Sequence, residues 1–161
     1  MGCDIHLYVE KIVEIEGEDK WCCCDHFKKN PFYGHYEDNQ KWEHIPIYDD
    51  RDYSLFALLA DVRSSWDIQP ISEPRGLPDD VSKEVKAASD DWGVDGHSHS
   101  WLTAKELFKH KNEPQLKPLI KAVKRRMAEE FYIYNFLDKE RKKQAYKDHA
   151  EDFRIVFWFD N

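Results

Sequence analysis

The chain has 161 residues, of which 41% are hydrophobic, 14% aromatic and 35% charged, and this composition is typical of a folded globular protein. Its 32 acidic and 24 basic residues give a net charge of −8, which disfavours nonspecific binding to nucleic acid unless the cations gather on one face. No run of residues approaches the ~20 apolar positions of a membrane-spanning helix, so a helical membrane protein is excluded. We expect one domain over residues 1–161.

The N-terminal segment alternates strictly between apolar and polar residues. Apolar residues occupy every second position from Cys3 to Val9, which is the period of a half-buried β-strand. A turn-prone segment over 16–19 follows, and residues 20–27 are expected to return as the second arm of a hairpin. The consecutive cysteines 22–24 lack the spacing of a zinc site, and we interpret them as strand residues of a protein in a reducing cytoplasm.

A surface excursion and a helix come next. Residues 29–50 are rich in Asn, Asp, Tyr and Pro, which indicates irregular surface structure with a short strand over 42–48. Helical periodicity then begins. It predicts a helix over 53–63 that Asp52 or Ser54 caps.

The following segment is interrupted by proline. Residues 64–78 contain three prolines and one glycine, so we expect a structured loop there. The loop is expected to deliver Asp79 or Asp80 as the cap of a short helix over 82–89.

The clearest local signal is a capping box. Thr103 is placed to accept a hydrogen bond from the Glu106 amide while the Glu106 side chain reaches back to the Thr103 amide, which predicts a helix over 104–111. A long apolar stripe then predicts one helix over 115–147. The last segment, 153–159, is apolar at nearly every position, which is typical of a central strand buried on both faces.

Together these elements predict a single α+β domain. An antiparallel sheet forms from the N-terminal hairpin and the C-terminal strand, and about four helices cover it. We expect residues 3–9 to pair with 153–159, because a strand with two apolar faces is more stable between neighbours than at an edge.

Five segments carry a resemblance. They are the hexapeptide Met-Gly-Cys-Asp-Ile-His at the start of the chain and residues 51–63, 75–78, 99–103 and 157–161. These segments resemble a family of small phage and bacterial proteins that begin with the same hexapeptide, and the resemblance spans nearly the whole chain. It implies a phage or prophage protein in the host cytoplasm, and it assigns no activity and no residue role.

A candidate metal site lies before the capping box. Asp95, His97 and His99 alternate within a polar loop expected over 95–100, so in an extended conformation all three side chains project to one side, within reach of a divalent metal ion. A divalent metal is the one cofactor that the sequence suggests. The alternative interpretation is a simple turn with exposed histidines.

Candidate catalytic residues follow from the same alternation on the first strand. Asp4 and His6 project to one face, and Asp160 stands at the end of the last strand. We predict that Asp4, His6 and His97 act as catalytic acids and bases in one polar cleft, with His99 and at least one arginine beside them.

Three arginines form a second candidate site. Arg51 and Arg63 bracket the first predicted helix and Arg75 lies in the proline-rich loop, so we expect them to converge as donors to phosphate groups. Tyr53 and Trp101 are predicted to stack a base. In the alternative interpretation each arginine pairs with a nearby carboxylate, among Asp50, Asp61, Glu73 and Asp79.

These patterns are compatible with three functions. The first is a hydrolase that acts on a nucleotide-like or phosphoester small molecule, with a divalent metal. The second is a binding protein without catalysis that sequesters a nucleotide-like molecule, as a phage counter-defence protein would. The third is an acidic protein that mimics nucleic acid.

The expected partner is a nucleotide-like small molecule. A homo-oligomer is possible from the sequence, and we expect binding neither to a membrane nor to nucleic acid. The basic run 121–126 is interpreted as the solvated face of a helix.

Overall fold

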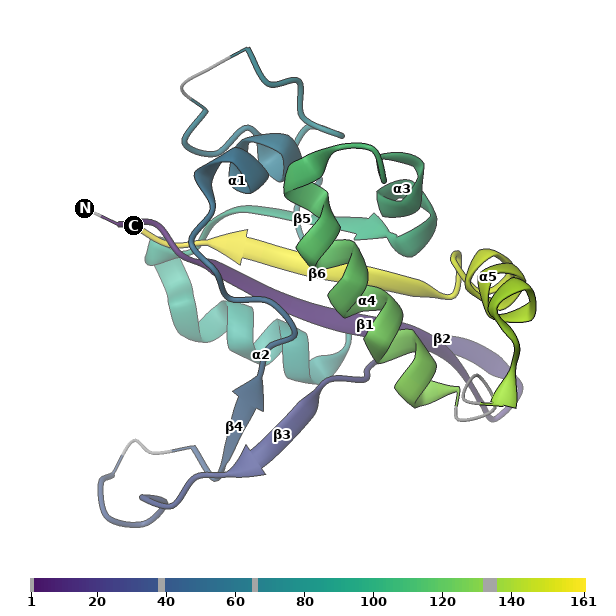
Figure 1. The fold of residues 1–161 in the computed structure, drawn as a ribbon. Helices are drawn as coiled ribbons and strands as arrows, with labels where there is room; N and C mark the ends of the chain where they lie inside the picture. The colour runs from purple at the N-terminus through teal and green to yellow at the C-terminus, as the bar shows by residue number, and fades with distance from the viewer. Residues whose placement is uncertain (1, 38–39, 65–66, 132–135) are drawn as a thin grey trace.

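The computed structural model describes residues 2–37, 40–64, 67–131 and 136–161, and these ranges contain six strands and five α-helices (Figure 1). Their bounds are β1 Ile5–Ile15, β2 Glu18–Cys23, β3 His26–Lys29, β4 Trp42–Ile45, α1 Tyr53–Ala60, α2 Lys83–Trp92, β5 His97–Thr103, α3 Ala104–Lys109, α4 Lys117–Glu130, α5 Lys139–Asp148 and β6 Phe153–Phe159. Two 3-10 turns, η1 Gly93–Asp95 and η2 Pro114–Leu116, precede β5 and α4. None of the helices in the described ranges combines the length and the apolar character needed to cross a membrane.

Four strands form one antiparallel sheet in the order β2-β1-β6-β5, and β3 and β4 form a separate two-stranded sheet. β1 runs along β6 from Ile5 opposite Phe159 to Lys11 opposite Phe153. All seven residues of β6 are buried. The predicted pairing of the two terminal strands, the central position of the last strand and the α+β class are therefore confirmed.

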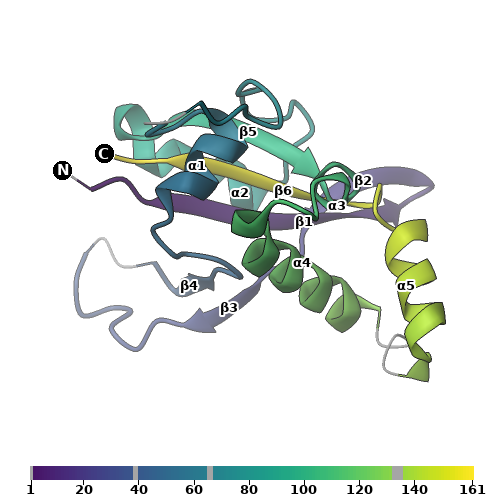
Figure 2. The same ribbon diagram turned by 45° about the horizontal axis from the view of Figure 1, so that its top comes forward.

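The two faces of the sheet pack against different helices. On one face, Leu7 and Phe157 belong to the main hydrophobic core together with residues of α1, α3 and α4. On the other face, Val156 and Trp158 pack against Val85 of α2. Figure 2 shows α1 and α4 on one side of the sheet and α2 on the other. Because neighbouring strand residues point to opposite faces, the apolar run of β6 contributes to both layers.

The N-terminal hairpin differs from its prediction in the second arm. β1 turns into β2 around Gly17, whose φ of 81° suits glycine, and this confirms the expected tip. The second arm ends at Cys23, and β3 pairs with β4 rather than with β1. Asp25 explains the break, because its carboxylate accepts the hydrogen bond of the Val9 amide on the edge of β1.

The first two helices keep their predicted place with different ends. Asp52 caps α1 as expected, and α1 stops before Asp61, which adopts a left-handed conformation with φ 56°. The position before α2 is occupied by Ser82, so the expectation that Asp79 or Asp80 caps this helix is wrong.

The single helix expected over 115–147 is also wrong. α4 ends at Glu130, and a separate helix, α5, begins after Asp138. The Asp138 carboxylate accepts a hydrogen bond from the Arg141 amide and so caps the N-terminus of α5. This cap lies inside the segment for which the apolar stripe predicts a single helix.

Candidate functional site

The predicted residues Asp4 and His6 lie where the two ends of the chain meet. Asp160 connects them, because its carboxylate accepts the Asp4 amide at 3.0 Å and pairs with His6 Nε2 at 3.0 Å. Arg51 donates two hydrogen bonds to the Asp4 carboxylate, at 2.8 and 2.7 Å. We call Asp4, His6, Arg51 and Asp160 the strand-end cluster.

The strand-end cluster fastens the chain ends to each other. Hydrogen bonds from the Arg51 guanidinium lower the pKa of the Asp4 carboxyl group. The same guanidinium lies against the N-terminal backbone, where a Cβ on Gly2 would come within 2.5 Å of it. His6 packs against the ring of Trp92 with a centroid distance of 4.1 Å. The acids and bases of this cluster are thus engaged with one another.

The two histidines of the predicted metal site face different cores. They belong to the edge strand β5 rather than to a polar loop, and a register shift with Ser98 at φ 53° interrupts the alternation of side chains. The His97 ring lies 6.2 Å from that of Phe159 in the main core. His99 instead stacks on Trp158 at 5.6 Å, on the α2 side.

The expected metal site is therefore a wrong prediction. Asp95 lies in the η1 turn, outside β5. No group of three or more His, Cys, Asp or Glu side chains is placed to hold a metal ion in the ranges that the structure describes. The expected common cleft is also a wrong prediction: His6 and His99 both pack on Trp158, whereas His97 faces the main core on the other side of the sheet, so Asp4, His6 and His97 are not brought together.

The three predicted arginines do not converge. Arg51 belongs to the strand-end cluster, and Arg63 donates to the side chain of Asn161 at 3.2 Å. Arg75 instead pairs with Glu106 at 2.5 Å, at the start of α3 and therefore toward the opposite end of β6. Each arginine has a polar partner, although none of these partners is a carboxylate that the sequence suggested.

The two predicted stacking residues are already packed. The Trp101 ring lies under the guanidinium groups of Arg75 and Arg154, at 4.7 and 5.8 Å. Tyr53 packs against Phe56 within its own helix, at a centroid distance of 5.7 Å. The predicted arginine and aromatic residues therefore lie in two regions of the fold, with Arg51, Tyr53 and Arg63 near the chain ends and Arg75 with Trp101 at the start of α3.

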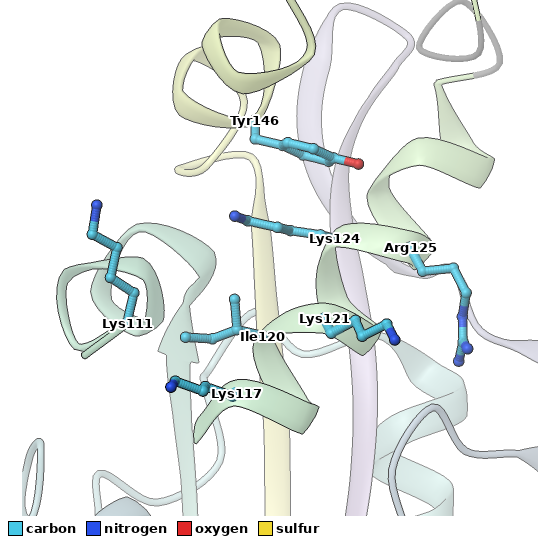
Figure 3. Close-up of a pocket in the computed structure, with 7 residues that line it drawn as sticks. All are labelled: Lys111, Lys117, Ile120, Lys121, Lys124, Arg125 and Tyr146. Carbon is cyan, nitrogen blue, oxygen red and sulfur yellow. The ribbon is translucent and has the colours of Figure 1, made fainter. Parts of the chain in front are cut away.

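A different site lies between α3, α4 and α5. A hollow of about 470 Å³ opens there, and its lining residues are Lys111, Lys117, Ile120, Lys121, Lys124, Arg125 and Tyr146. Figure 3 shows Lys111, Lys117 and Lys124 around the hollow, with the Tyr146 ring beside Lys124. An adjoining hollow of about 680 Å³ shares Lys111, Lys124 and Tyr146 and adds further lysines, which are Lys105, Lys109, Lys143 and Lys147. We call the two hollows together the lysine groove.

Lys124 is the central cation of the lysine groove. Its Nζ lies 5.2 Å from the ring centroid of Phe108 and 5.5 Å from that of Tyr146. Burial lowers the pKa of the Lys124 ammonium group, and the positive charges of Lys111 and Lys143 lower it further. Most lysines of the groove have no carboxylate partner. Within the described part of the chain, no ion pair includes Lys109, Lys111, Lys117, Lys124, Lys143 or Lys147.

The sequence contains a signal for this groove in the distribution of charge along the chain. Residues 104–147 hold 13 of the 24 basic residues and 6 of the 32 acidic residues, so this segment carries +7 and the rest of the chain carries −15. The basic run 121–126, interpreted above as a solvated helix face, is one part of this segment. Comparison of the chain with family profiles, curated proteins and solved structures finds no match.

Proposed function

We propose that the protein binds a phosphate-bearing, nucleotide-like small molecule in the lysine groove. The observation that carries this proposal is the convergence of Lys111, Lys117 and Lys124 on one hollow without neutralising carboxylates among the described residues. Ammonium groups that line one hollow repel one another, and a ligand with several negative charges relieves that repulsion. The lowered pKa of Lys124 is consistent with this mutual repulsion.

The size of the lysine groove favours a small ligand over nucleic acid. Hollows of about 470 and 680 Å³ are of the order of small-molecule sites, roughly 300–1,000 Å³. The rest of the chain carries −15, which repels an extended polyanion that reaches beyond the groove. Tyr146 and Phe108 add aromatic surface beside the cations, which suits the base or ring of a nucleotide.

Binding without hydrolysis fits the chemistry of the lining. Among the described residues that line the lysine groove there is one carboxylate, Glu140, and no histidine. The acid–base residues Asp4 and His6 are engaged in the strand-end cluster. A protein that holds such a molecule unchanged sequesters it from other proteins, which is the second of the three functions compatible with the sequence.

Calorimetric titration with ATP, inorganic tripolyphosphate and adenosine tests the proposal. We expect ATP and tripolyphosphate to bind, adenosine not to bind, and both affinities to fall as salt screens the lysines. The double variant Lys111→Gln/Lys143→Gln should weaken ATP binding at least tenfold. Lys83→Gln on α2 is the matched control, because Lys83 is exposed and outside the lysine groove.

Two results would contradict the proposal. Equal affinity of the groove variant and the Lys83→Gln control would show that ATP binds elsewhere. Chromatography of the ATP after long incubation is expected to recover it intact, and formation of ADP or AMP by the purified protein would replace the binding function with a hydrolase.

A further inference from the structure

A third hollow, of about 670 Å³, lies between α2 and the β3–β4 hairpin. We call it the hairpin pocket. Its lining includes three carboxylates, Asp25, Glu84 and Asp91, and three aromatic rings, Tyr8, Phe27 and Trp42. None of these residues belongs to the lysine groove or to the strand-end cluster, so the hairpin pocket is a separate site.

Asp25 is the buried anion of the hairpin pocket. Its side chain is 0% exposed, and Oδ2 accepts from the Val9 amide at 3.1 Å and pairs with His44 Nε2 at 2.7 Å. The other oxygen, Oδ1, is buried and has no hydrogen-bond partner among the described residues. A buried carboxylate with one oxygen unsatisfied is incompletely compensated, and it favours a cation nearby.

Two buried groups beside Asp25, the Tyr8 hydroxyl and the Cys23 thiol, have raised pKa values. Burial raises the pKa of Tyr8 to about 12, and the charges of Asp25 and Asp91 act in the same direction. Burial likewise raises the pKa of the Cys23 thiol to about 12, with Asp25 again among the causes. Both groups therefore stay protonated at neutral pH, and the carboxylates dominate the charge of the pocket.

The carboxylates are spaced along one face of α2. Glu84 and Asp91 are seven residues apart, which places them about 10 Å from each other along the helix. Ala87 and Ala88 lie between them on the same face of α2 and also line the hairpin pocket. The surface between the two carboxylates, which we call the alanine floor, is therefore apolar and formed by small side chains. Asp91 accepts a hydrogen bond from Gln40 at 2.8 Å, which joins this end of the floor to the segment before β4.

The aromatic side faces this floor. Trp42 is 52% exposed and Phe27 is 40% exposed, although both are large apolar residues. Tyr8 is stacked on His44 at 3.9 Å, which holds its ring in place. Lys41, the one lysine among the described residues of the lining, places its Nζ 5.9 Å from the Trp42 ring, so one positive charge stands against the three carboxylates of the pocket.

We propose that the hairpin pocket binds an aliphatic polyamine. The two terminal ammonium groups of a triamine such as spermidine, about 10 Å apart, match the spacing of Glu84 and Asp91. The methylene segments between them lie on the alanine floor, and the middle ammonium group faces the Trp42 ring. The exposed ring of Trp42 covers the chain and favours its charge, while Tyr8, stacked between His44 and Trp158, forms part of the wall. The proposal does not rest on the lysine groove, because the residues and the sign of the charge are different.

Calorimetric titration of the full chain with spermidine tests the polyamine site. We expect saturable binding of spermidine, no binding of 1,8-octanediol, which has a chain without charge, and much weaker binding of Mg²⁺, which has charge without a chain. Asp91→Asn should weaken spermidine binding at least tenfold while keeping an acceptor for Gln40. Asp90→Asn is the matched control, since Asp90 is the neighbouring acid and pairs with Lys86 outside the pocket.

Several outcomes would overturn the proposal. Equal binding of octanediol would make the pocket an apolar hollow, and equal binding of Mg²⁺ would reduce it to diffuse negative charge. Tighter binding of a lysine-rich peptide than of spermidine would assign the pocket to a protein side chain. Trp42→Leu is expected to weaken spermidine binding with unchanged thermal unfolding, and the groove variant Lys111→Gln/Lys143→Gln should bind spermidine as the natural chain does.

Discussion

The lysine groove and the hairpin pocket lie on opposite faces of one sheet and carry opposite charge. Burial is the main cause of both pKa shifts, the lowered pKa of Lys124 and the pKa of about 12 of Tyr8, and neighbouring cations add to the first while neighbouring carboxylates add to the second. The charges are separated by element, with the cations on α3 to α5 and the anions on α2 and the loop after β2. A net charge of −8 therefore does not exclude an anion-binding site.

The two regions also rest on different supports. The helices around the lysine groove pack on aliphatic and phenylalanine side chains of the main core. The sheet face beneath α2 is instead an aromatic and imidazole layer, in which Trp158 contacts His6, Tyr8 and His99. The Trp158 indole nitrogen is buried there without a hydrogen-bond partner among the described residues. We expect substitutions beneath the lysine groove to alter stability through packing. Substitutions on the α2 side should alter stability through charge, in a way that depends on pH.

Removing β6 should abolish both regions, and this is the largest effect we expect. Deletion of residues 153–161 exposes the edge of β1 and removes side chains that are buried on both faces. The shortened chain should lose its cooperative thermal unfolding, followed by circular dichroism, and bind neither ATP nor spermidine. Removal of Asn161 alone, which accepts one hydrogen bond from Arg63, should change little. An unchanged unfolding midpoint after the longer deletion would contradict the central role of β6.

A buried ion pair on the α2 side should give the next largest effect. Arg154 and Glu10 are 3% and 0% exposed, and Glu10 also accepts the Ser82 amide at the start of α2. Arg154→Met leaves the Glu10 carboxylate buried without its cation, which should lower the free energy of unfolding by ~3–5 kcal/mol. Chemical denaturation measures this loss.

The double variant Glu10→Met/Arg154→Met is the control for that prediction. Replacing both partners with apolar side chains of similar length removes the uncompensated charge, so much of the lost stability should return. If the double variant were as unstable as Arg154→Met alone, packing around Trp21 and Trp101, rather than charge, would explain the loss.

The elements that local patterns determine could be predicted from the sequence. The period of two over residues 3–9, the apolar run over 153–159 and the capping box of Thr103 and Glu106 all appear as expected. The end of α4 and the start of α5 could not be predicted from the apolar stripe, because a cap at Asp138 overrides periodicity. The bulge at Ser98 could not be predicted either, because it depends on the register in which β5 pairs with β6.

The candidate sites show the same division. Asp4 and His6 were expected to share a face, and they do, but their partner Arg51 comes from a distant segment and neutralises Asp4. Both proposed sites are assembled from segments far apart in sequence, such as Lys111 with Tyr146 or Asp25 with Asp91. Motif spacing cannot reveal such convergence, whereas the uneven distribution of charge along the chain does indicate it.

The capping box tests the groove side with a smaller expected effect. Thr103 accepts the Glu106 amide at 3.1 Å, and the Glu106 side chain accepts the Thr103 amide at 2.9 Å. Thr103→Ala should lower the free energy of unfolding by about 1 kcal/mol. Glu106→Ala should cost more, because it also removes the partner of Arg75. The two losses should be less than additive in a double-mutant cycle, and strict additivity would count against a reciprocal box.

His99 should give the smallest effect, and only as the pH falls. Burial lowers the pKa of His99 from its usual value of 6.5, and the charge of His97 lowers it further. Between the lowered value and 6.5 the unfolded chain binds more protons at this residue than the folded chain, so its contribution to stability is present above pH 6.5 and declines below it. We expect the free energy of unfolding of the natural chain to fall more between pH 7.5 and 5.5 than that of His99→Gln. The difference between the two proteins isolates the contribution of His99 from that of the other seven histidines.

Ser89→Ala is the control for this prediction. It removes the hydroxyl that lies 3.0 Å from His99 Nε2 but leaves the imidazole, so it should lower stability at both pH values and keep the fall in stability between them. Equal falls in the natural chain and in His99→Gln would show that this imidazole is as easily protonated in the folded protein as in the unfolded one.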